Sequence, residues 1–89
     1  MMARQLWRGT WYVFNYVRKE FVRYFATRRV YYTPAMKYAK IYKNPHNAMR
    51  AAEALNRSCG RYTHQALPEN AAWCLDQMNM RESEEEKGD

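Results

Sequence analysis

Aliphatic side chains are scarce in this chain of 89 residues. Leu, Ile, Val and Phe together number only 12, and such a low share with a high net charge is typical of disordered chains. Ordering the chain costs on the order of 130 kcal/mol, at about 1.5 kcal/mol per residue. Twelve such side chains are too few to offset that cost by burial. We therefore expect a chain that becomes ordered on a partner.

Glycine and paired acids are also scarce. Only Gly9, Gly60 and Gly88 occur, which excludes a Gly-rich loop that holds phosphate. Glu53 and Asp76 are isolated acids, whereas acid–base or nucleophilic catalysis needs a second group within reach. We therefore expect no catalytic residue, no cofactor and no small-molecule substrate, so the protein is predicted not to be an enzyme.

Cysteine and histidine number two each, in the order His46, Cys59, His64 and Cys74. Structural zinc sites present ligands in pairs two to four residues apart, and the gaps here are 13, 5 and 10. No metal site is expected. A disulfide between Cys59 and Cys74 stays open, because one thiol would end a helix and the other would lie early in the next.

Long hydrophobic runs are missing. In the first half of the chain the longest run without a charge is "GTWYVFNYV", from Gly9 to Val17. A membrane-spanning helix needs about 20 apolar residues, so none is predicted, and no apolar core of a secretory signal is present.

Acids are nearly absent from the first half. Residues 1–50 hold eleven Lys or Arg against the single acid Glu20, whereas residues 82–89 hold five acids and one Lys. The basic body should therefore seek phosphate, lipid headgroups or an acidic protein, and the acidic tail should lie in solvent.

The residues that are abundant are those that dominate protein interfaces. Trp, Tyr, Arg and Met together number 27. The stretch "FVRYFATRRVYYTP", from Phe21 to Pro34, places aromatic and cationic residues side by side without an acid. Four interpretations are open: a mitochondrial import segment, a helix on a membrane surface, an RNA ligand, and a clamp onto another protein.

The spacing of aromatic residues predicts a first amphipathic helix over residues 6–29, although "YVFNYV" alone would also suit a strand. Thr33-Pro34, Asn44-Pro45 and Leu67-Pro68 are helix-start signals and predict helices over 34–43, 45–59 and 68–81. Gly60 is the expected terminator of the third. The fold class expected is all-α: an elongated chain of three to four helices over residues 1–81, with a disordered acidic tail over 82–89.

Short, basic, Tyr- and Trp-rich chains of this type resemble the supernumerary subunits of mitochondrial respiratory-chain complexes and ATP synthase. The resemblance covers residues 1–81 and matches no family motif. It implies a non-catalytic accessory subunit, peripheral to the inner membrane, with an uncleaved N-terminus that serves in import. Its partners would be larger protein subunits and anionic phospholipid. The alternative is a small mitochondrial ribosomal protein that binds rRNA.

For the accessory subunit, the residues expected at the interface with protein partners or lipid are the aromatic and cationic side chains of the first helix and one Trp of the last. They are Trp7, Trp11, Phe14, Arg18, Phe21, Arg23, Phe25, Arg28, Arg29 and Trp73. The arginines would pair with acidic residues or phosphates, and the aromatic side chains would fill grooves of the partner.

Overall fold

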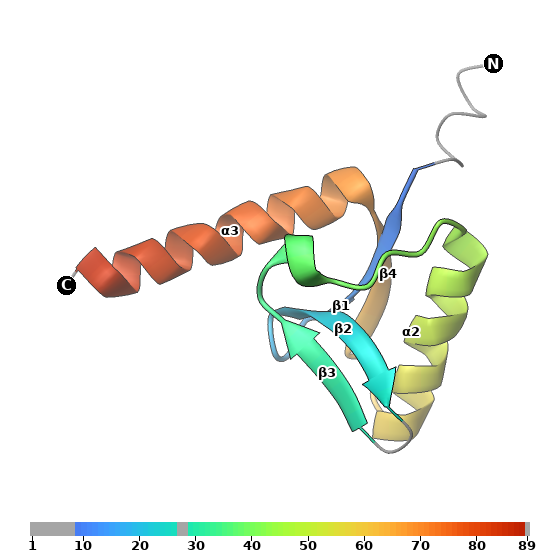
Figure 1. Cartoon of the computed structure of the whole chain (residues 1–89). Helices are drawn as coiled ribbons and strands as arrows, with labels where there is room; N and C mark the ends of the chain where they lie inside the picture. Colours follow the sequence, from blue (N-terminus) through green and yellow to red (C-terminus); the bar gives the residue numbers. More distant parts are fainter. Residues whose placement is uncertain (1–8, 27–28, 89) are drawn as a thin grey trace.

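The computed structural model describes residues 9–26 and 29–88 and shows an α+β fold (Figure 1). Its elements in chain order are β1 (Trp11–Asn15), β2 (Glu20–Ala26), β3 (Arg29–Thr33), the 3-10 turn η1 (Met36–Tyr38), α2 (Pro45–Cys59), β4 (His64–Pro68) and α3 (Glu69–Gly88). The strands form one antiparallel sheet in the order β3-β2-β1-β4. The expectation of an all-α fold is therefore wrong.

The first predicted helix is replaced by β1 and β2. Tyr12 and Phe14 pack on one face of the sheet and Val13 on the other, so β1 is buried on both faces. A strand of this kind reads as an almost continuous apolar run and does not alternate. The Asn15 side chain then accepts hydrogen bonds from the backbone N–H groups of Val17 and Arg18. These bonds form a turn after β1, which is incompatible with a helix that continues through this point.

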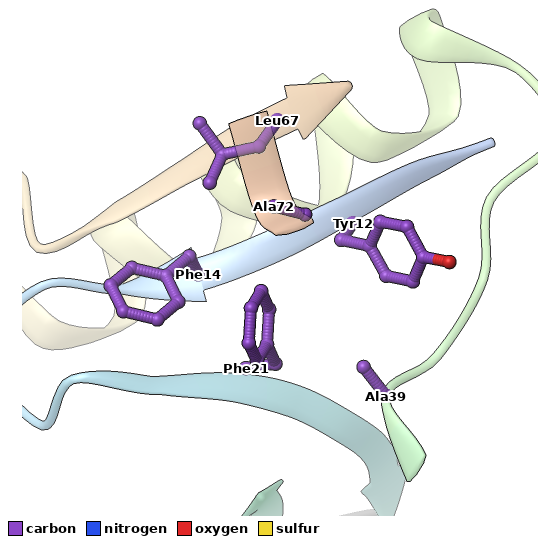
Figure 2. Packing of buried hydrophobic residues seen from close by; sticks show 6 residues of the cluster. All are labelled: Tyr12, Phe14, Phe21, Ala39, Leu67 and Ala72. Carbon is purple, nitrogen blue, oxygen red and sulfur yellow. The ribbon is translucent and has the colours of Figure 1, made fainter. Parts of the chain in front are cut away.

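Buried residues form one cluster on each face of the sheet. The α3-side cluster contains Tyr12, Phe14, Phe21, Ala39, Leu67 and Ala72 (Figure 2). The α2-side cluster contains Val13, Val22, Tyr42, Ala48, Ala52 and Leu55. In the first cluster the rings of Phe14 and Phe21 meet edge to face, with centroids 4.9 Å apart, a geometry that adds to the gain from burial alone. The chain thus builds an internal core from aromatic and small side chains.

Helix α2 forms as its sequence signals predict. The side chain of Asn44 accepts a hydrogen bond from the His46 N–H (2.8 Å), and Pro45 occupies the first turn. Gly60 ends the helix with φ 73°, in the left-handed region. Ala48 and Ala52 are small enough to let α2 approach the sheet closely.

The helix expected over 34–43 is reduced to the single turn η1. Beyond it the chain is extended, because Lys40 N–H donates to the carbonyl of Val22 (2.9 Å), and Trp11 and Tyr42 exchange two backbone hydrogen bonds. Strands β1 and β2 pair only at Phe14–Phe21 and Asn15–Glu20. The segment 40–42 therefore makes backbone hydrogen bonds to the parts of β1 and β2 that are not paired with each other.

Helix α3 begins one residue later than predicted and continues to Gly88. The expected disordered tail over 82–89 is therefore helical through residue 88. The first half of α3 packs over β1, β4 and η1, and its second half extends beyond the sheet (Figure 1). Within the described ranges, none of the helices is both long and apolar enough to cross a bilayer.

Candidate functional site

The β2–β3 hairpin extends beyond the part of the sheet that pairs with β1. Strand β2 is buried at Phe21 and Val22, but all of its last four residues are exposed. The pairing with β3 shifts register between Val22 and Tyr24, and such an irregularity bends and twists a strand. This part of the hairpin, residues 23–26 and 29–31, is exposed except at the half-buried Val30 and Tyr31 and is called the hairpin arm below.

The hairpin arm presents a stacked pair of tyrosines. Tyr24 on β2 is paired with Tyr31 on β3, and their rings lie 4.5 Å apart between centroids with planes only 14° from parallel. The neighbouring Tyr32 packs against the α2-side cluster, so Tyr31 projects from the opposite face. On that face the Tyr24 side chain is still 47% exposed.

A third exposed ring, on η1, is linked to this pair through Arg23, the residue before Tyr24. Tyr38 of η1 is 56% exposed. The guanidinium carbon of Arg23 lies 5.8 Å from the Tyr38 ring centroid, and the Lys37 ammonium nitrogen lies 5.1 Å from it. We define the tyrosine face as Tyr24, Tyr31, Tyr38, Arg23, Arg29 and Lys37.

The tyrosine face has a positive charge. Three of its six members are Lys or Arg and none is an acid, while Asp76 of α3 accepts a hydrogen bond from the Met36 N–H of η1 (2.9 Å). Cations beside exposed aromatic rings attract anions, and the rings themselves offer flat surfaces for stacking. The arrangement can therefore bind a ligand that carries both negative charge and planar groups.

A second polar cluster, around His64, is buried. His64 Nε2 lies 2.8 Å from the Tyr32 hydroxyl and 3.3 Å from Asn15 Nδ2. His64 Nδ1 lies 3.0 Å from Thr63 Oγ1 and 3.3 Å from Asn56 Oδ1. Each ring nitrogen thus has two polar neighbours.

The neighbouring amides fix the tautomer of His64. Asn15 Oδ1 accepts from two backbone N–H groups, so its Nδ2 faces the ring and donates to Nε2. The proton of the neutral ring therefore sits on Nδ1. Burial lowers the pKa of His64 below its usual 6.5. Because these partners occupy both ring nitrogens and none is an activated nucleophile, the cluster holds strands together and offers no catalytic centre.

The residues predicted for the interface divide into four groups. Phe14 and Phe21 are 2% and 0% exposed, so they cannot anchor a partner; the strand pattern turns both into the core. Trp11 is half-buried against the α2-side cluster. Trp7 and Arg28 lie outside the described residues.

The remaining predicted residues are exposed but only some lie together. Arg23 and Arg29 belong to the tyrosine face, whereas Phe25 is opposite Val30, which packs on the α2 side. Arg18 lies over the Tyr32 ring, at 4.5 Å, and pairs with Glu20 at 3.1 Å. Trp73 is 56% exposed on α3.

Sequence reasoning missed Tyr24, Tyr31, Tyr38 and Lys37. The predicted helix ended at residue 29 and so left Tyr31 outside the element that held Tyr24, whereas strand pairing brings the two into contact. The short run "RVYYT", rich in aromatic and β-branched residues beside charged ones, was a strand signal that could have found them.

The cysteines are not joined. Cys59 and Cys74 are both free and exposed, at the end of α2 and on α3. These two helices cover opposite faces of the sheet, which explains why the expected hairpin geometry is not formed. In the part of the chain that the structure describes, no three His, Cys, Asp or Glu side chains are grouped to hold a metal ion.

Comparison with known proteins gave no match: no family model, no curated protein and no solved structure is similar to this chain. The function must therefore be argued from the tyrosine face itself.

Proposed function

We propose that the protein binds nucleic acid through the tyrosine face. The observation that carries this proposal is the stacked pair on the hairpin arm, in which Tyr24 is exposed and Tyr31 half-buried, with Arg23 and Arg29 close to them in the chain. Paired aromatic residues on an exposed sheet face, with cations at their border, are the elements that nucleic-acid-binding sheets use.

The cations supply the first part of the binding energy. Arg23, Arg29 and Lys37 are exposed and can contact phosphates, which releases condensed counterions. Binding should therefore weaken steeply with salt. The tyrosines supply contacts that salt affects less, because stacking on a base does not depend on charge.

The test compares two pairs of arginines by fluorescence anisotropy, with a labelled 12-nucleotide single strand as probe. The double variant Arg23→Gln/Arg29→Gln should lower affinity about tenfold or more. It should also reduce the slope of log K against log salt by about 1.4, at about 0.7 per phosphate contact on a single strand. The matched control Arg50→Gln/Arg57→Gln removes the same charge from exposed positions of α2.

The control variant should retain most of the affinity of the unaltered protein. Equal losses in the two double variants would mean that net charge alone attracts the probe. Lack of binding to single-stranded or duplex RNA and DNA at 50 mM salt would refute the proposal.

Contact with a larger protein assembly is a second candidate function. Helix α3 exposes Trp73, Met78 and Met80 at 56%, 55% and 51%, and these residue types are adaptable interface contacts. The assignment to a respiratory-chain complex depends on an anchoring first helix, and that helix is not formed. We therefore propose the accessory role only in this general form, with a ribosomal neighbour as one case.

A mitochondrial location stays a prediction from the basic, acid-poor first 32 residues. Fractionation of cells that express a C-terminally tagged chain tests it, and crosslinking mass spectrometry on the same cells identifies the partners. Crosslinks that avoid α3 would argue against the second candidate.

A further inference from the structure

We infer that the ligand of the tyrosine face is a single strand whose unpaired bases stack on the rings, and that duplex is a poor ligand. This inference rests on the proposed function and specifies its substrate class. It follows from the arrangement of the rings and the cations.

The tyrosine pair offers a stacking surface that a duplex cannot use. With planes 14° from parallel and centroids 4.5 Å apart, the rings of Tyr24 and Tyr31 already form a two-member stack. A base can extend such a stack on a free ring face, and Tyr24 is 47% exposed. Inside a duplex both faces of each base are covered by neighbouring bases, so only an unpaired base can enter.

Arg23 supplies a cation next to the stacked pair. It precedes Tyr24 in the chain, and its guanidinium lies 5.8 Å from the Tyr38 ring. A base that stacks on Tyr24 brings its phosphate to this part of the hairpin arm, where the exposed Arg23 can contact it.

The tyrosine face has few means to read base identity, since only its two arginines and one lysine can bond a base edge, at guanine. Its six members are three tyrosines and three cations, so it contains neither amide nor carboxylate side chains. Asn, Gln, Asp and Glu supply much of the base-edge recognition in nucleic-acid complexes. Stacking tolerates every base because each has a planar face, and we therefore expect a sequence-tolerant binder of single strands.

The experiment uses three labelled probes of 12 nucleotides at 100 mM salt: a mixed-sequence single strand, its duplex, and an abasic single strand with the same phosphates. The unaltered protein should bind the first at least tenfold more tightly than either of the others. The variant Tyr24→Leu/Tyr31→Leu should lose about 5- to 150-fold of its affinity for the normal strand, the range for one stacked base. Its affinity for the abasic strand should not change.

The matched control is Tyr62→Leu, because Tyr62 is 98% exposed on the loop after α2 and belongs to no cluster. Circular dichroism and thermal melting check that each variant is folded. If the double variant on the strands does not fold, Tyr38→Leu replaces it, since Tyr38 lies on the exposed turn η1.

The outcomes separate this inference from the proposed function. Equal affinity for the normal and the abasic strand would refute stacking but leave a phosphate-binding face. Preference for duplex would refute the inference in the same way. Failure to bind any probe would refute both.

Discussion

The hydroxyl of Tyr32 lies 2.8 Å from Nε2 of His64 and joins the two edge strands of the sheet, β3 and β4. Between them, on β1, Asn15 donates to the same nitrogen. Because Nε2 has no proton in this arrangement, the tyrosine hydroxyl is the donor. The bond therefore ties the base of the hairpin arm to the opposite side of the sheet.

Replacing Tyr32 with Phe should destabilise the protein. The change removes the hydroxyl and leaves His64 Nε2, in a residue only 5% exposed, with Asn15 as its one donor. The expected loss in the free energy of unfolding is about 1 to 2 kcal/mol. Urea denaturation followed by circular dichroism measures it, and an unchanged midpoint would contradict the assigned bond.

The same substitution at Tyr42 should have the opposite effect on the free energy of unfolding. The Tyr42 hydroxyl is buried and, with Trp11 Nε1, is a buried side-chain atom without a hydrogen-bond partner in the described part of the chain. Burial raises the pKa of Tyr42 to about 12, since the charged form would lose its hydration. Tyr42→Phe removes an unpaired polar atom from the core and should raise the free energy of unfolding by about 1 kcal/mol. Thermal melting beside Tyr32→Phe gives a direct comparison, and a lower melting temperature would show that the hydroxyl has a partner.

Stability should fall on mild acidification. The pKa of His64 is lowered in the folded protein by burial, so below pH 6.5 the unfolded chain takes up a proton that the native protein does not. The contribution of His64 to the free energy of unfolding is therefore complete above pH 6.5. It is lost progressively as the pH falls from 6.5 to the lowered pKa of the native protein. Urea denaturation between pH 8 and pH 5 tests the decrease.

His64→Gln should be less stable overall but show a flatter profile across this range, whereas the matched variant His46→Gln, at an exposed position of α2, should keep the slope. An equal slope in the two variants would assign the titration to another group.

Gly60 tests the end of α2. Its φ of 73° is costly for residues with a Cβ, and nothing lies within 4 Å of where that Cβ would stand, so the cost is one of backbone conformation alone. Gly60→Ala should lower the free energy of unfolding by about 1 to 2 kcal/mol. Gly60→Asn should cost less, because Asn adopts this conformation more readily. Equal costs would point to a clash instead.

Helix α2 could be predicted from sequence because its signals are local. Asn44 starts it through its side chain, Pro45 fits the first turn, and Gly60 ends it through its own backbone conformation. Strand β1 could not, since its run is apolar on both faces and gives no alternation. Its identity as a strand depends on the helices that cover both sides, which are distant in sequence.

The candidate site was predictable only in part. The acid-free stretch that contains Arg23 and Arg29 was visible from charge alone. The stacking of Tyr24 on Tyr31 was not, because it depends on the register of β2 against β3 and on the shift after Val22. A register is a property of two segments together, and the helical interpretation of residues 6–29 left no partner strand.

Helix α3 carries the acid-rich end of the chain beyond the sheet (Figure 1), while Arg23 and Arg29 lie on the sheet and Lys37 on η1. Opposite charges at separate ends make the molecule an electric dipole. The field of an approaching polyanion orients such a protein before contact, so that the negative end of the protein points away from the polyanion. Encounters would then begin in a favourable orientation, and this advantage would vanish first as ionic strength rises.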